Sequence, residues 1–447
     1  MVEDDFARAR KTAAEQTATL MSGSTSNLPI FFGVPFTVKE MLSYKGMKRT
    51  GGSIHHRHVV MDWDATIVER MRHAGAIPMG TTNVPELGFW FETFNPVYGR
   101  TNNPYDIGRT CGGSSGGEGS LIGAGASPFG LGSDIGGSIR IPAFFCGVFG
   151  HKPSRFWVPL TGHFPYGREE FVDLLVKEKY PFTSTGPLTR RAADLNPLLQ
   201  VMAGADAHDR ETLKDISLLK DERGWVGRKV LICPEPAFHG ARRAEPEMAQ
   251  VVRNCGKLFE EMGAQVEELD SRFFVRGTQL WFAALKNSKT KDLYETLMGP
   301  EKSLSIGKEL MKLALGRADY TLPNLIVSLA EILKVGSKDL TEELNALEQM
   351  KKDLDEKLGP DGILLLPPHS RVAPKHRAVM WSPLDFIYTG LFTTLGHPAT
   401  SIPTGLNRDG LPLGVQVVAR HGMDHLTLAC AEFLEITFGG WTPPSSL

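Results

Sequence analysis

The chain has 447 residues, of which 41% are hydrophobic and 22% are charged, values ordinary for a globular protein. The formal net charge is −2, so nucleic acid is not expected as the main partner. The five cysteines are odd in number and form no C-x-x-C pair, so neither a disulfide framework nor a zinc site is indicated. No signal peptide and no transmembrane run of about 18 apolar residues is present, and an intracellular location is expected.

The hydrophobic pattern predicts helices that alternate with strands. The expected elements, in chain order, are a helix within residues 1–20, a buried strand from Ile30 to Lys39, a helix and a strand over 62–81, a strand–helix–strand unit over 229–269, and a helix and a strand over 340–366. This alternation is typical of an α/β fold built on one sheet.

Residues 108–152 are rich in glycine and serine but are not a linker. Large apolar residues interleave with the glycines, which a solvated linker does not need. Glycine inside a regular helix or strand costs roughly 0.5–1 kcal/mol relative to alanine, so the density indicates tightly turning, buried backbone. Such backbone exposes N–H groups that could bind an anion or an oxyanion.

Three interpretations of this stretch compete. A phosphate-binding loop requires a lysine after its last glycine, but Glu118 follows Gly117 and would repel phosphate. A nucleophile elbow, G-x-S-x-G, is present at residues 112–116, although a glycine–serine run produces this motif easily by chance. The third interpretation combines Ser114 with Ser138 and with Lys39 from the VPFTVKE segment.

Several segments together resemble the amidase signature family and, within it, the fatty-acid amide hydrolases. Lys39 precedes Ser114 by 75 residues and Ser138 follows Ser114 by 24, as in that family. The segments that carry the resemblance are VPFTVKE, GGSSGGEGS, GSDIGGSIRIPAFFCGVFGHKPS, GPLTR at 186–190, VAPKH at 372–376 and GLPLGVQVVA at 410–419. Members of the family begin well upstream, often with a hydrophobic anchoring helix, so the chain is N-terminally short relative to them.

The resemblance implies a large, mixed, twisted sheet covered by helices, in a single catalytic domain over residues 1–447. It implies that Ser138 is the nucleophile, that Ser114, preceded by a cis peptide bond, relays protons, and that Lys39 is the base. The oxyanion would be bound by the N–H groups of Ile135, Gly136, Gly137 and Ser138. The substrates would be long-chain primary fatty amides and N-acylethanolamines, hydrolysed without a metal or an organic cofactor. The resemblance also admits peripheral membrane contact and a homodimer.

The chemistry required of Lys39 is consistent with this assignment. A serine hydroxyl is a weak nucleophile until a base takes its proton. A lysine can act as that base only when neutral, so its pKa must fall from ~10.4 towards ~7–8 through desolvation. The apolar run before Lys39 predicts that burial. The alternative is a surface lysine paired with Glu40.

Other features allow alternatives. An α/β-hydrolase esterase would use Ser114 with a histidine base such as His376, His397 or His425. The sequence also fits an amidase of the same family that acts on another carboxylic amide, or a protein left inactive by loss of the N-terminal helices. Residues 281–335 contain two amphipathic segments broken by Pro323. The resemblance to membrane-bound relatives implies a membrane-facing lid there, and peripheral packing of the two segments is the simpler explanation. The histidines at 55, 56 and 58 have no glutamate or cysteine nearby and are expected to be surface residues rather than metal ligands.

Overall fold

The computed structural model describes residues 1–23, 26–165, 183–209, 212–213, 216, 221, 223–288, 305–332 and 339–445. In this part of the chain, eleven strands form one mixed sheet in the order β1-β3-β2-β6-β8-β7-β12-β13-β11-β9-β10. The strands are β1 (Glu3–Asp4), β2 (Pro35–Lys39), β3 (Ile77–Thr82), β6 (Phe129–Asp134), β7 (Phe149–Lys152), β8 (Ser184–Thr189), β9 (Lys229–Ile232), β10 (Gln265–Glu268), β11 (Ile363–Leu366), β12 (Ala399–Leu406) and β13 (Pro412–Ala419). The predicted α/β class with a large mixed sheet is confirmed.

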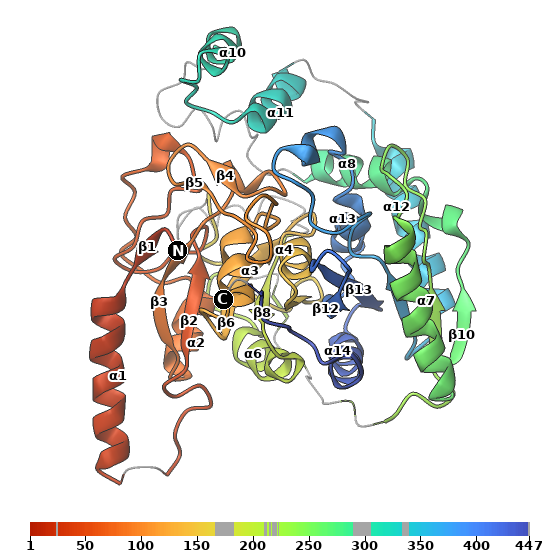
Figure 1. The fold of residues 1–447 in the computed structure, drawn as a ribbon, viewed down its shortest axis with the longest axis horizontal. Coiled ribbons are helices and arrows are strands. Elements are labelled where there is room, and N and C mark those ends of the chain that lie inside the picture. The colour runs from red at the N-terminus through yellow and green to blue at the C-terminus, as the bar shows by residue number, and fades with distance from the viewer. Residues whose placement is uncertain are drawn as a thin grey trace.

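Helices cover both faces of this sheet (Figure 1). They are α1 (Phe6–Met21), α2 (Thr66–His73), α3 (Gly116–Gly123), α4 (Arg140–Phe145), α6 (Leu195–Met202), α7 (Pro246–Glu261), α8 (Gly277–Asn287), α10 (Ile306–Ala314), α11 (Leu322–Ile332), α12 (Thr341–Leu358), α13 (Ile387–Thr394) and α14 (Asp424–Phe438). Alternate residues of β11 show the two cores. Ile363 and Leu365 pack with α6, α7 and α14, whereas Leu364 and Leu366 pack with α8, α12 and α13. Successive side chains of a strand point to opposite faces, so a strand buried on both sides reads as a continuous apolar run.

The predicted strand–helix–strand unit is β9–α7–β10, whose two strands are parallel. The strand predicted from Ile30 begins only at Pro35. Residues 30–33 form turns, Gly33 has φ +83°, and Ile30 is 61% exposed. A positive φ suits glycine and interrupts an extended strand, so the predicted start of the strand at Ile30 is five residues too early.

Helices α10 and α11 lie at one end of the molecule, away from the sheet (Figure 1). The prediction that Pro323 breaks the helical segments is wrong. Pro323 lies in the first turn of α11. A first-turn N–H has no partner within its helix, so proline is tolerated there. Residues 289–304 and 333–335 of the predicted lid lie outside the described residues. Among the helices that the structure describes, none is long and apolar enough to cross a membrane.

Candidate active site

Lys39 is the last residue of β2, and its side chain is 0% exposed. β2 pairs in parallel with β3 on one side and with β6 on the other, so its carboxyl end opens between two neighbouring strands. The side-chain nitrogen Nζ lies 2.7 Å from Ser114 Oγ and 2.9 Å from Ser133 Oγ. The alternative of a surface lysine paired with Glu40 is wrong, because Glu40 is buried and accepts hydrogen bonds from the N–H groups of Thr50 and Gly51.

The surroundings of Lys39 favour its neutral form. Burial lowers its pKa from 10.5 to about 7, although the negative charges of Asp134 and Glu118 oppose the shift. The charged form of a buried amine loses hydration that neighbouring dipoles replace only in part. A lysine with a pKa near neutrality can accept a proton, which is what a general base must do.

Ser114 lies where the two serine-bearing segments meet. It follows a cis peptide bond with Gly113, as the family resemblance implied, and stands just before α3. The next N–H, that of Ser115, donates to the carbonyl of Ser138 at 3.0 Å. The loop that carries Ser138 is thereby held against Ser114. Ser114 is only 4% exposed, whereas Ser138 is partly exposed, so Ser138 is the more accessible of the two hydroxyls.

The turn from Ile135 to Ser138 connects β6 to α4 and is shaped by Asp134. The Asp134 carboxylate accepts hydrogen bonds from the N–H of Gly137 at 2.7 Å and of Ile139 at 3.1 Å. The N–H of Gly137 is therefore engaged inside the turn. For Ile135, Gly136 and Ser138, the described part of the chain contains no hydrogen-bond acceptor for the backbone N–H. These three groups could stabilise an oxyanion.

Gly137 must be glycine for two reasons. Its φ is +115°, which L side chains rarely adopt, and a Cβ would lie 1.9 Å from Thr389 Oγ1. Asp134 itself is held by the buried guanidinium of Arg140 at 2.9 Å. Burial alone would raise the pKa of Asp134, but the charge and hydrogen bonds of Arg140 lower it to about 2. The carboxylate therefore stays ionised and keeps the turn in shape.

Sequence analysis missed three buried groups around Lys39. Ser133 and His163 form a hydrogen-bonded chain that ends at the lysine amine. Glu118 was interpreted only as a charge that excludes phosphate. It is buried, and it accepts hydrogen bonds from the hydroxyls of Thr37 and Thr82. Burial raises the pKa of Glu118 to about 7, although both hydroxyls lower it. The sequence signal that could have found Glu118 was its place four residues, about one helical turn, after Ser114.

The histidines proposed as alternative bases lie elsewhere. His376 contacts Glu92, and His397 contacts Asp355. Among the described residues, none of His376, His397 and His425 has a hydrogen bond to Ser114. His55, at the predicted surface cluster, pairs with Tyr320, and among the described residues no group of side chains could hold a metal ion.

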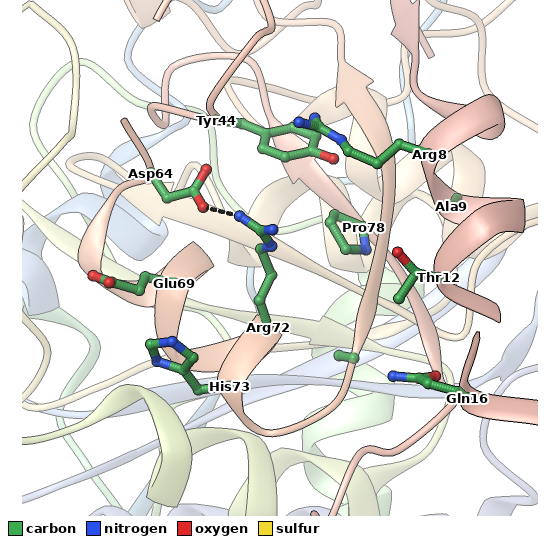
Figure 2. Close-up of a pocket in the computed structure, with 11 residues that line it drawn as sticks. Arg8, Ala9, Thr12, Gln16, Tyr44, Asp64, Glu69, Arg72, His73 and Pro78 are labelled. Atoms are coloured by element: carbon green, nitrogen blue, oxygen red, sulfur yellow. Dashed lines mark hydrogen bonds and ion pairs between the residues drawn. The ribbon is translucent and has the colours of Figure 1, made fainter. Parts of the chain in front are cut away.

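A cavity of about 280 Å³ lies between α1, α2 and β3 (Figure 2). Its lining contains none of the predicted site residues. Its two arginines are ion-paired, Arg72 with Asp64 and Arg8 with Asp5. We therefore assign this cavity no part in the chemistry at Lys39.

Comparison with known proteins decides the family. Residues 1–428 match the family model described as Amidase. The chain belongs to the amidase signature family. It is 41% identical over 424 residues to human fatty-acid amide hydrolase 2, an alignment that covers 93% of this chain and 76% of the relative. The chain is accordingly an amide hydrolase.

More distant relatives agree on the fold. An acylamidase of Rhodococcus erythropolis is 29% identical over 442 residues, with 97% of this chain and 87% of the relative covered. The solved structure of 6-aminohexanoate cyclic dimer hydrolase superposes with a TM-score of 0.77 at 24% identity, covering 99% of this chain and 90% of that one. At that identity the superposition shows a shared architecture and nothing about substrate.

Proposed function

We propose that the protein is a serine amidase in which Ser138 is the nucleophile, Ser114 relays protons and Lys39 is the base. Ser138 Oγ attacks the amide carbonyl carbon, while its proton passes to Ser114 and the Ser114 proton passes to Lys39. The proton then returns through Ser114 to the leaving nitrogen as the C–N bond breaks. Water, activated by the same groups, hydrolyses the acyl-serine and releases the acid.

The observation that carries this proposal is the 2.7 Å contact between Lys39 Nζ and Ser114 Oγ in a fully buried setting. A pKa of about 7 leaves a large fraction of the amine neutral at neutral pH, so this contact can carry a proton. The oxyanion would be bound by the N–H groups of Ile135, Gly136 and Ser138. Gly137, also expected in that role, instead donates to Asp134 and holds the turn. We further propose that residues 1–447 form one catalytic domain, since eleven of the described strands share a single sheet.

For the substrate we propose long-chain primary fatty amides and N-acylethanolamines. The similarity to fatty-acid amide hydrolase 2 supports a lipid substrate. Aromatic rings beside the oxyanion turn are suited to an acyl chain. A Cβ on Gly136 would lie 3.1 Å from the Phe386 ring and 3.6 Å from the Trp281 ring. Those two rings pack edge to face, with centroids 4.6 Å apart.

We expect kcat/KM to rise steeply with acyl length in a series of primary amides assayed below their micellar concentrations. Each buried methylene contributes about 0.8 kcal/mol of transfer free energy, equivalent to roughly fourfold per methylene until the apolar wall is covered. Phe386→Ala should flatten this slope, whereas Phe94→Ala, at a 42% exposed phenylalanine of β4 (Phe94–Asn95), should leave it unchanged. A slope near zero in the wild type would favour an amidase for short or polar amides.

We also propose that α10 and α11 form a lid that touches a lipid surface. Three apolar side chains of α10 and its end are exposed: Leu310 by 40%, Met311 by 63% and Leu315 by 68%. Lys308 and Arg317 are exposed beside them. Lys312, four residues after Lys308, is instead ion-paired with Glu309 at 2.6 Å and with Asp319 at 2.7 Å. Exposed apolar residues flanked by cations suit an interfacial helix.

This lid is connected to the active site. Glu86, at the start of a short turn over Glu86–Gly88, accepts hydrogen bonds from Thr321 and Asn324 near the start of α11. At the other end of that turn, a Cβ on Gly88 would lie 3.6 Å from Ser114 Oγ. A displacement of α11 would therefore reach the catalytic serines through a few residues.

Replacing Leu310, Met311 and Leu315 together by serine should lower binding to anionic phosphatidylserine vesicles by about tenfold or more, since burying each side chain is worth roughly 1.5–3 kcal/mol. Turnover of a vesicle-borne long-chain amide should fall with it, while a short soluble amide is spared. The control is Val226→Ser with Ile436→Ser, two residues exposed by 81% and 85% elsewhere on the surface. Equal losses on both substrates would show that α10 is only structural.

A further inference from the structure

The neutral Lys39 amine has two N–H groups to donate and one lone pair to accept. Three oxygens surround it: Ser114 Oγ at 2.7 Å, Ser133 Oγ at 2.9 Å and the Ser133 carbonyl at 3.3 Å. The carbonyl can only accept, so it takes one N–H. Each hydroxyl can donate or accept, and these contacts alone do not decide which serine gives its proton to the lone pair.

His163, which contacts the Ser133 hydroxyl, fixes the direction of these hydrogen bonds. Its Nδ1 lies 2.6 Å from the Phe164 carbonyl, which can only accept, so Nδ1 carries the hydrogen. Burial and the nearby charge of Lys39 lower the pKa of His163 to about 3, so the ring is neutral at working pH. Its Nε2 is then a bare acceptor, 2.7 Å from Ser133 Oγ. The Ser133 hydroxyl must donate to it.

We propose that His163 is a positioning residue for amide hydrolysis: by accepting the Ser133 hydroxyl hydrogen, it makes Ser133 Oγ an acceptor for Lys39 and leaves the amine lone pair to Ser114 alone. The inference rests on the proposed function, in which Lys39 takes the Ser114 proton. It also explains how one site accommodates both states of the base. Protonated Lys39 donates its three hydrogens to Ser114 Oγ, Ser133 Oγ and the Ser133 carbonyl, with no other rearrangement.

The loop that carries His163 is fixed to the exit of β2. The Phe164 N–H donates to the Met41 carbonyl at 2.7 Å, and His163 forms a bridge with Leu42. The charged groups facing this cluster are Asp134 and Glu118 near Lys39, and Arg49 near His163. The Arg49 guanidinium donates to Ser43 Oγ and to the Gly162 carbonyl, which holds the same loop.

The test compares three substitutions that separate the two nitrogens of the ring. His163→Leu removes both hydrogen bonds while filling the space. His163→Gln places an amide oxygen where Nε2 was and so keeps the acceptor. His163→Asn keeps a donor to the Phe164 carbonyl but loses the acceptor, so it still tests the proposal should the leucine variant not fold. The pH dependence of kcat/KM is recorded for each, with a melting curve.

The leucine and asparagine variants should lose about 10- to 100-fold in kcat/KM, the size typical of one misdirected hydrogen bond to a catalytic group. The acid limb of their pH profile, where kcat/KM rises with pH, should move to lower pH. The freed Ser133 hydroxyl now donates to the Lys39 amine and stabilises its neutral form, which lowers the pKa of the amine. His163→Gln should stay within about threefold of the wild type with its midpoint unchanged. Combining His163→Leu with Ser133→Ala should cost no more than Ser133→Ala alone, because the two residues act as a unit.

The control is His397→Leu, which removes a buried histidine bonded to Asp355 and should leave the midpoint in place. The proposal is overturned if asparagine restores activity and glutamine does not, if the midpoint stays fixed in the leucine and asparagine variants, or if the effects of His163 and Ser133 add. Failure of the proposed function is seen separately, as a wild-type acid limb that survives removal of the Lys39 amine.

Discussion

Ser138→Ala should abolish turnover and eliminate covalent labelling by a serine-reactive fluorophosphonate. The nucleophile forms the acyl-enzyme bond itself, and no neighbouring group replaces it, so the expected loss is about 10⁴-fold or more. Ser114→Ala should instead leave slow activity, about 10²- to 10³-fold down, because a water molecule can relay protons in place of the hydroxyl. Mass spectrometry of the labelled peptide identifies the modified serine directly.

The two serine variants also separate the amidase from the esterase alternative. In the esterase alternative the covalent residue is Ser114, so its alanine variant would lose all label. The partial exposure of Ser138 against the 4% exposure of Ser114 favours Ser138. A wild-type adduct on Ser114 would contradict the proposed roles of both residues.

Lys39→Met should lower kcat/KM by roughly 10³- to 10⁴-fold at pH 7 and remove the acid limb of the pH profile. With a pKa of about 7, the wild-type amine is mostly protonated and inactive below that pH and mostly neutral above it. Wild-type kcat/KM should therefore rise as pH increases through about 7 and level off above about 8. Methionine keeps the length of the side chain without an amine, so the loss reports the base.

A second buried lysine provides the matched control. Burial, with the charge of Arg140, lowers the pKa of Lys152 to about 7 as well, so the midpoint of a pH profile alone does not identify the base. The Lys152 amine donates to the Pro153 carbonyl and has no hydrogen bond to either serine within the described residues. Lys152→Met should keep the wild-type limb. If Lys152→Met lost the acid limb of the pH profile and Lys39→Met kept it, the role given to Lys39 would be contradicted.

The elements of this protein that depend on local pattern could be predicted from the sequence. The periodic apolar stripes of α2, α7 and α12 and the apolar run of β11 were predicted, because helix and strand periods are written in adjacent residues. Lys39, Ser114 and Ser138 were predicted as catalytic residues from the resemblance to the amidase signature family, whose short motifs they carry at matching spacings.

The groups that surround the lysine amine could be found only in the folded molecule. His163 lies 124 residues beyond Lys39 in an ordinary-looking T-G-H-F-P loop, and it meets Ser133 because that loop folds back onto the exit of β2. Glu118 was interpreted only as a charge that excludes phosphate, whereas it is buried beside the hydroxyls of Thr37 and Thr82 and its pKa is raised by that burial. Gly137 looked like a free oxyanion donor, but the Asp134 carboxylate occupies its N–H. Burial and hydrogen bonding between distant segments fix protonation and donor direction, and neither is encoded in the spacing of neighbouring residues.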